Sequence, residues 1–175
     1  MSKDWRLSTF NGALLASYII PSWTIAAMKI WISPIRGVYD RPNVGPAMFV
    51  SDYMNLPPLE TIRFAWILAL GKVTVAAFLL IFLVFIIRDS LRKKATGDEA
   101  LGIALTIGSI ISFASMMASA QVHEFAALRL HAAETLLLVG AAIVLIVDSP
   151  RAAARDVRHP VRDREATFSL GNPTS

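Results

Sequence analysis

Hydrophobic residues fall into four long stretches that are separated by short charged segments. The stretches cover residues 12–33, 62–87, 101–120 and 126–147. Each is long enough for a helix of about 20 residues, which is what a crossing of roughly 30 Å of hydrocarbon requires. The pattern therefore predicts an all-α integral membrane protein, with one bundle of four transmembrane helices inside residues 1–150.

Two segments lie outside these predicted helices. Residues 34–60 contain five prolines and two glycines, so we expect little regular helix there, apart from a short amphipathic piece at residues 47–55. This loop is either a lid over the bundle or a plain connection in the headgroup region. Residues 151–175 are polar and rich in arginine, and we expect them to form a basic, largely disordered tail.

The composition agrees with a membrane protein and limits its chemistry. Hydrophobic residues make up 55% of the 175 residues and charged residues only 17%, which is more apolar than a soluble core of this size needs. The chain has no cysteine, which excludes disulfides, thiolate metal sites and cysteine nucleophiles. No phosphate-binding glycine loop and no Ser/His/Asp spacing stands out. The sequence thus predicts no catalytic residue and favours a protein without activity of its own.

Lysine and arginine gather beside three of the segment ends. Lys3 and Arg6 precede the first stretch, four basic residues follow the second between positions 88 and 94, and five arginines follow the fourth between 151 and 164. The positive-inside bias then predicts that both termini are cytoplasmic, in a bacterial-type inner (plasma) membrane. The basic tail would attract anionic lipids, which accounts for the net charge of +4 without nucleic acid.

Two charged residues lie deep in the predicted helices. Lys72 is about ten residues into the second helix and Glu134 about nine into the fourth, so both lie roughly 13 to 15 Å from the outer side. An unpaired charge at that depth costs on the order of 3 kcal/mol, and pairing is the usual remedy. We therefore predict that Lys72 and Glu134 pair across helices, either within a functional site or only to set the helix register.

Further polar residues occur in the same outer half. His131 precedes Glu134 by about one helical turn and shares its face. Lys29 lies on one face of the first helix with Tyr18 and Ser22, although its long side chain can instead reach the headgroups. The candidate residues for a polar pocket that opens outward are Lys29, Lys72, Ser115, Ser119, His131 and Glu134.

A metal or haem site has little support. His123 and His131 are eight positions apart, roughly 12 Å along a helix, which is too far for both to bind one ion. His131 and its neighbouring carboxylate supply only two ligands, so the sequence predicts no metal site. Trp23, Trp31 and Trp66 fit an aromatic belt at the membrane interface better than a cofactor site.

Four short runs stand at characteristic places in the predicted helices. They are Ala-Ala-Met-Lys-Ile at residues 26–30, Leu-Gly-Lys-Val-Thr-Val-Ala-Ala at 70–77, Glu-Ala-Leu-Gly at 99–102 and Met-Ala-Ser-Ala at 117–120. Together with the helix order over residues 12–147, they resemble the DoxX-like family of small four-helix membrane proteins. Members of that broader family are linked to quinol-oxidising or thiosulfate-oxidising respiratory assemblies. The resemblance implies a redox partner complex, with Lys29 and Lys72 as the positions of interest, although the Pro-rich loop and the Arg-rich tail depart from it.

Three hypotheses for function follow from these observations. The first is a small accessory or assembly subunit of a membrane redox or respiratory complex, whose partners are other membrane-protein subunits. The second is a binder or transporter of a small anionic or quinone-like molecule, which Lys72 and His131 contact. No cofactor is firmly implied by the sequence, and a quinone is the one that this hypothesis allows. The third is a purely structural membrane protein.

Cysteines introduced at Asn43 and Gln121 should react with an impermeant thiol reagent added to intact cells, because the positive-inside bias places both positions outside. Cysteines at Thr96 and Thr174 should react only after the membrane is broken. The measurement is the labelling of each single-cysteine variant in intact and in lysed cells. Labelling of the Thr96 variant in intact cells would reverse the predicted orientation.

Overall fold

Helices make up nearly all of the described backbone. The computed structural model describes residues 7–32, 41–92 and 97–169, and the side chains within 7–32, 44–88 and 97–148. The helices are α1 (Leu7–Ile32), α3 (Arg41–Met54), α4 (Pro58–Arg92), α5 (Asp98–Gln121) and α6 (Phe125–Ser169). No strand occurs in these ranges, which confirms the predicted all-α class.

Four of the helices are long and apolar enough to cross a membrane. Their candidate spans are Leu7–Ile32, Pro58–Arg88, Asp98–Gln121 and Phe125–Asp148. Each span coincides with one predicted stretch to within about five residues, because a run of apolar side chains is the feature that bilayer insertion selects. The chain is therefore a multi-pass membrane protein. The side on which the termini lie stays a prediction.

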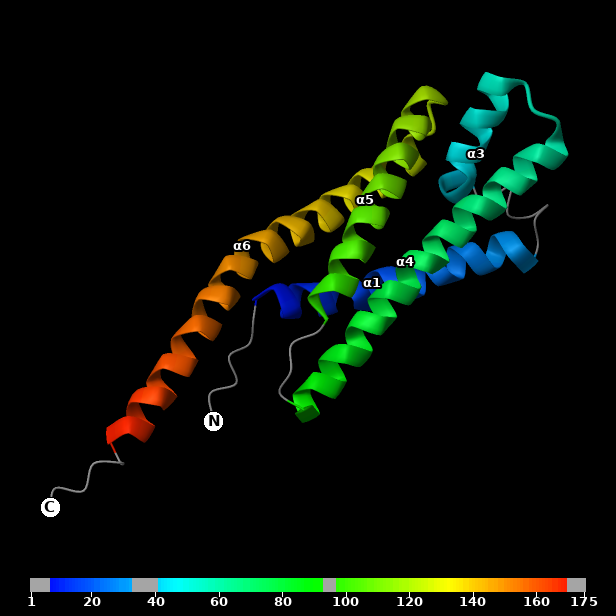
Figure 1. Cartoon of the computed structure of the whole chain (residues 1–175). Coiled ribbons are helices and arrows are strands. Elements are labelled where there is room, and N and C mark those ends of the chain that lie inside the picture. The colour runs from blue at the N-terminus through cyan, green and yellow to red at the C-terminus, as the bar shows by residue number, and fades with distance from the viewer. Residues whose placement is uncertain (1–6, 33–40, 93–96, 170–175) are drawn as a thin grey trace, which may run out of the picture.

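The four spanning helices pack in a closed ring. α1 contacts α4 and α6, and α5 contacts the same two helices. Figure 1 shows α5 and α6 meeting at the short turn between them, with α3 and the start of α4 close by. We call this end, where α1 and α5 end and α4 and α6 begin, the α3 end.

Residues 34–60 contain more helix than the sequence predicts. α3 covers 14 residues of this loop and packs against α4, α5 and α6. Pro42 fits in its first turn, where N–H groups have no helical partner, but Pro46 removes one helical hydrogen bond. The side chains of Val44 and Ala47 are fully buried on either side of Pro46. Their packing offsets the missing bond, which a reading of prolines alone does not capture.

α3 and α4 form a helical hairpin. α3 ends in a Schellman motif, in which Asn55 has a φ of 49° and the Leu56 N–H donates to the Ser51 carbonyl at 3.0 Å. The hydroxyl of Thr61, in the first turn of α4, then donates to the Ser51 hydroxyl at 2.8 Å. These contacts hold the end of α3 beside the start of α4.

Buried apolar side chains form two clusters along the bundle. The smaller one fills the α3 end and consists of Ala27, Ile30, Val44, Ala47, Ala65 and Ala69. The larger one fills the opposite half and includes Leu15, Ile19, Val75, Leu79, Phe82, Leu101, Leu105 and Leu138. Ala69 lies about three turns into α4 and belongs to the same cluster as Val44 and Ala47 of α3. The first half of α3 therefore reaches into the bundle.

Gly12 allows α1 to approach α4 and α5 closely. A Cβ atom placed on Gly12 would lie 2.8 Å from side-chain atoms of both Phe82 and Leu101. Ala16 and Ala27 lie on the same buried face of α1. Small residues permit this close packing, so α1 turns its small face inward rather than the polar face of Tyr18 and Lys29.

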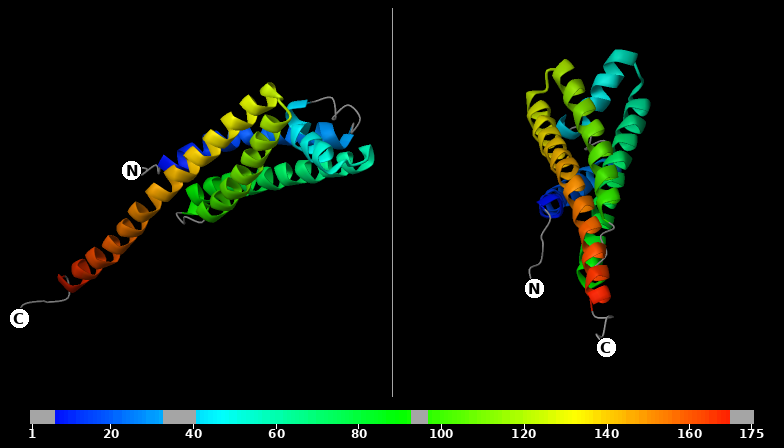
Figure 2. Two further views of the ribbon diagram at one scale, coloured as in Figure 1. Left: turned by 90° about the horizontal axis from the view of Figure 1, so that it is seen from above. Right: turned by 60° about the vertical axis from the view of Figure 1, so that its left-hand side comes forward.

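α6 continues well beyond its candidate span. The helix runs to Ser169, which is 21 residues past Asp148, although the sequence predicts a largely disordered tail after residue 150. Figure 1 and Figure 2 show this extension projecting away from the bundle. The run of alanines at 152–154 and the many charged residues are good helix formers, which offsets Pro150 and Pro160. We call residues 149–169 the α6 arm.

Asp148 caps the first turn of α1. The backbone N–H and the hydroxyl of Ser8 both donate to Asp148 Oδ2, at 3.2 and 2.7 Å. The first N–H groups of a helix have no partner within the helix, and negative charge beside them is favourable. The carboxylate at the end of the α6 span therefore ties α6 to the start of α1.

Replacing Asp148 with alanine should lower the free energy of unfolding by about 1 to 2 kcal/mol, because α1 loses a charged cap. Adding Ser8→Ala should then cost little more, since the partner of Ser8 is already gone. The measurement is unfolding in detergent followed by circular dichroism. Thr106→Ala is the control, because Thr106 is exposed and its hydroxyl donates within α5 to the Gly102 carbonyl. Equal losses in Asp148→Ala and Thr106→Ala would show that the cap does not stabilise the bundle.

Candidate functional site

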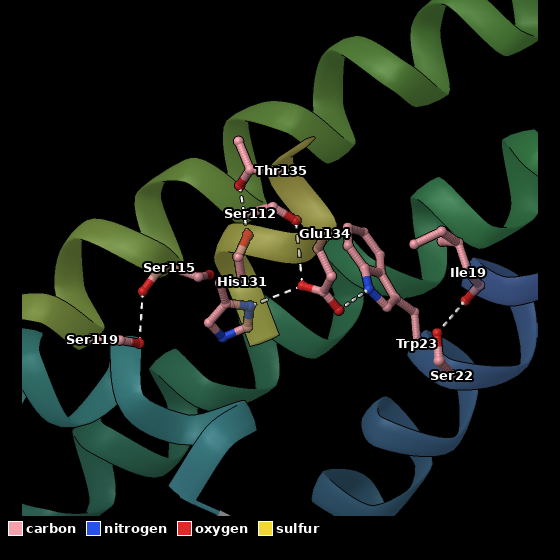
Figure 3. Close-up of polar contacts among 9 residues, drawn as sticks. All are labelled: Ile19, Ser22, Trp23, Ser112, Ser115, Ser119, His131, Glu134 and Thr135. Atoms are coloured by element: carbon pink, nitrogen blue, oxygen red, sulfur yellow. Dashed lines mark hydrogen bonds and ion pairs between the residues drawn. The ribbon is translucent and has the colours of Figure 1, made fainter. Parts of the chain in front are cut away.

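Glu134 lies at the centre of a buried group of polar residues. Its carboxylate accepts hydrogen bonds from Trp23 Nε1 at 2.8 Å and from Ser112 Oγ at a longer 3.5 Å (Figure 3). Nδ1 of His131 lies 2.9 Å from the second carboxylate oxygen. An ionised carboxylate has only acceptor positions, so Nδ1 carries the proton in this contact. We call Trp23, Lys72, Ser112, His131 and Glu134 the Glu134 cluster.

Lys72 belongs to the same cluster through its charge. Its side chain is only 3% exposed, and its Nζ atom lies 5.6 Å from the centroid of the Trp23 ring. A cation within about 6 Å of an aromatic face is attracted to it. The positive charge of Lys72 also acts on the Glu134 carboxylate. Trp23 is thus a partner of both charged residues, because its N–H contacts the carboxylate and its ring contacts the ammonium group.

The Glu134 cluster joins all four spanning helices. Trp23 comes from α1, Lys72 from α4, Ser112 from α5, and His131 with Glu134 from α6. His131 and Glu134 are three positions apart, which brings them to the same face of α6. The charges of Lys72 and Glu134 cancel when His131 is neutral, so the cluster adds no net charge to the apolar interior. Removing one partner of such a buried pair leaves an uncompensated charge and is strongly destabilising.

The cluster forms a polar layer between the two apolar clusters. Along α4, Lys72 lies between Ala69 of the smaller cluster and Val75 of the larger one. His131 and Glu134 are 1% and 3% exposed, respectively. These residues are therefore enclosed by the bundle. The outward-opening polar pocket expected from the sequence stays a prediction.

α3 packs against the last turns of α5, at the α3 end of the bundle. A Cβ atom on Gly45 would lie 3.1 Å from Ser119 Oγ and 3.7 Å from the Cβ of Ala127. Such distances place the backbone of α3 directly against α5 and α6. Gly45 is buried, and so is Ser119. The start of α3 thus closes the α3 end of the bundle above the Glu134 cluster.

The predicted site residues separate into three groups. Lys72, His131 and Glu134 come together in the Glu134 cluster. Ser115 and Ser119 are buried on α5, where the Ser119 hydroxyl donates to the Ser115 carbonyl at 2.8 Å. Lys29 lies on the exposed side of α1, away from the buried face.

The polar face expected on the first helix does not line the interior. Tyr18 is 47% exposed, and the Ser22 hydroxyl donates back to the Tyr18 carbonyl at 2.8 Å. A serine that bonds to its own helix satisfies its hydroxyl without a neighbouring helix. The interior position of α1 is taken by Trp23 instead.

Sequence reasoning missed two members of the site, Ser112 and Trp23, and it assigned Trp23 to an aromatic belt. The Trp23 side chain is 1% exposed, whereas Trp31 and Trp66 are partly exposed as an aromatic belt requires. One signal was present in the sequence. Trp23 lies nine residues before the end of α1, and Glu134 lies nine residues after the start of α6. Their depths therefore match, and an indole N–H at that depth needs an acceptor.

The expected lack of a metal site stays a prediction from the sequence. In the part of the chain that the structure describes, no group of three His, Asp, Glu or Cys residues could hold a metal ion. His123 is exposed in the turn between α5 and α6, where it has a φ of 57°. The N–H of Glu124 donates to the Ser119 carbonyl at 3.1 Å, so His123 occupies the left-handed position of a Schellman motif.

Comparison of the chain with known protein families, curated proteins and solved structures finds no match. The resemblance to the DoxX-like family stays a prediction from the residues alone.

Trp23→Phe should lower the free energy of unfolding by about 1 to 2 kcal/mol, because the ring is kept while the N–H donor to a buried carboxylate is lost. The measurement is unfolding in detergent followed by circular dichroism. Trp66→Phe is the matched control, since Trp66 is 45% exposed on the outer face of α4 and should change stability by less than about 0.5 kcal/mol. Equal losses in the two variants would mean that the Trp23–Glu134 hydrogen bond does not contribute to stability.

Proposed function

We propose that this protein is a small accessory subunit of a membrane complex, and that it acts through its surfaces rather than through an open site. The observation that carries this proposal is the Glu134 cluster. Lys72, His131 and Glu134 are enclosed and engaged with partners from all four spanning helices. Charged groups arranged in this way fix the relative positions of the helices. A bundle held in this way offers a rigid surface for other subunits.

The α6 arm supports this proposal as a surface for a partner. It continues the helix for 21 residues beyond the span, which is about 30 Å, and it projects away from the bundle in Figure 1 and Figure 2. A helix that projects in this way offers another subunit a surface to contact. The DoxX-like resemblance is the reason to expect a redox or respiratory complex as the partner.

The second candidate function is the binding of a small anionic or quinone-like molecule at the Glu134 cluster. The observation that favours it is the cover over the cluster. α3 is too short to span a membrane, and its contact with α5 at Gly45 and Ser119 involves small side chains. If α3 moved outward, a ligand could reach Lys72 and His131. α3 would then act as the lid that the sequence allows.

Deleting residues 151–175 should separate the protein from its complex, while deletion of residues 170–175 alone should not, because the α6 arm ends at Ser169. Both variants and the full chain would be solubilised from native membranes in mild detergent. Their assembly masses would be measured by native electrophoresis, and their helix content by circular dichroism. The expected result is a large assembly for the full chain and the shorter deletion, and a folded but unassembled bundle for the longer deletion.

Two outcomes would contradict the accessory-subunit proposal. One is a full chain that migrates alone in every mild detergent, and the other is a longer deletion that stays assembled. The second candidate has a separate measurement, which is the amount of small molecule extracted from the purified protein. Stoichiometric extraction that falls at least tenfold in both Lys72→Met and His131→Gln would favour ligand binding instead.

A further inference from the structure

An apolar groove lies between α3, α4 and α5, outside the Glu134 cluster. Its volume is about 530 Å³, which is within the range of small-molecule sites. Phe49 of α3, Phe64 and Leu68 of α4, and Ile110 and Ala114 of α5 contribute to its walls. Gln121 is a polar residue at one end of the groove.

The groove runs along the α3-end half of the membrane. Gln121 is the last residue of α5, and Ile110 lies eleven residues before it, or about 16 Å along the helix. One end of the groove is therefore at the membrane interface, and the other is near the middle of the span. Ile110 is 64% exposed and Met117 47%, so the groove opens sideways towards the lipid.

The size of the groove decides what can fill it. A volume of about 530 Å³ spread over about 16 Å of helix makes a long and narrow groove, which matches the shape of one extended hydrocarbon chain. Since the open side faces the bilayer, the chain that is present at the highest concentration is that of a membrane lipid.

We propose that this groove is a binding site for one acyl chain of a membrane phospholipid, with the lipid head group beside the Gln121 amide. Gln121 can donate and accept hydrogen bonds, which suits the ester and phosphate oxygens of a head group. The bound chain covers the half-buried side chains of Phe49 and Val50, on the part of α3 that the four spanning helices leave open. This lipid holds α3 against α4 and α5, a role separate from both proposed functions of the Glu134 cluster and the α6 arm.

The test compares two alanine-to-tryptophan variants of the full chain. Ala114→Trp fills the groove, because Ala114 lines it from an exposed position on α5. Ala120→Trp is the matched control, since Ala120 is an exposed alanine of the same helix outside the groove lining. Each protein would be purified in detergent and examined by native mass spectrometry. The expected result is one retained phospholipid for the wild type and Ala120→Trp, and at least a tenfold loss of this lipid-bound form for Ala114→Trp.

A second measurement does not depend on the folding of any variant. The wild type would be reconstituted into vesicles of phosphatidylethanolamine and phosphatidylglycerol that contain a phospholipid with a photoreactive diazirine in one acyl chain. Cross-links should concentrate on residues 46–50, 64–68 and 110–121. Even labelling of all lipid-facing helix surfaces would overturn the proposal, and so would equal lipid retention by Ala114→Trp and the wild type. A second copy of the chain bound in place of lipid would overturn it as well.

Discussion

A carboxylate held inside hydrocarbon must be paired, and in this protein the Glu134 carboxylate imposes that requirement on the whole bundle. Its partners come from every other spanning helix, either directly as Trp23 and Ser112 or through charge as Lys72. The apolar clusters on either side of this layer pack without directional preference, since dispersion and burial do not specify one rotation of a helix. Hydrogen bonds to one carboxylate do specify it. The rotation of each spanning helix is therefore set by polar contacts, and its close packing by small residues such as Gly12.

The sequence alone was enough to predict the four spanning helices and three of the five members of the Glu134 cluster. Each span is visible as an apolar run, and Lys72 and Glu134 are recognisable by their depth and cost. His131 follows from helical spacing. Lys29 shows the limit of this approach, because periodicity identifies a polar face but not whether that face turns inward. In α1, Trp23 and the small residues face inward, and the polar face is the outer one.

Trp23 and the first half of α3 were not predicted, for two different physical reasons. Tryptophan is common at membrane interfaces, so Trp23 was assigned to an interface. A buried indole N–H instead needs a hydrogen-bond acceptor. In α3 the prolines argued against a helix, yet Val44 and Ala47 are buried against helices that are distant in sequence. Such long-range packing outweighs local propensity and cannot be read from the segment itself. The α6 arm is the opposite case, because its run of alanines at 152–154 favours a helix that was not expected.

The position of Glu134 on the last spanning helix also orders the events of synthesis. Lys72 precedes Glu134 by 62 residues in the chain. A ribosome adds about 5 to 20 residues per second, so roughly 3 to 12 s pass between the synthesis of the lysine and that of its acidic counterpart. In this interval α1 and α4 already exist, with a lysine and an indole that have no carboxylate to meet. The bundle can close only when its final span is inserted. Any other group that Trp23 and Lys72 contact before then has to be released when Glu134 arrives.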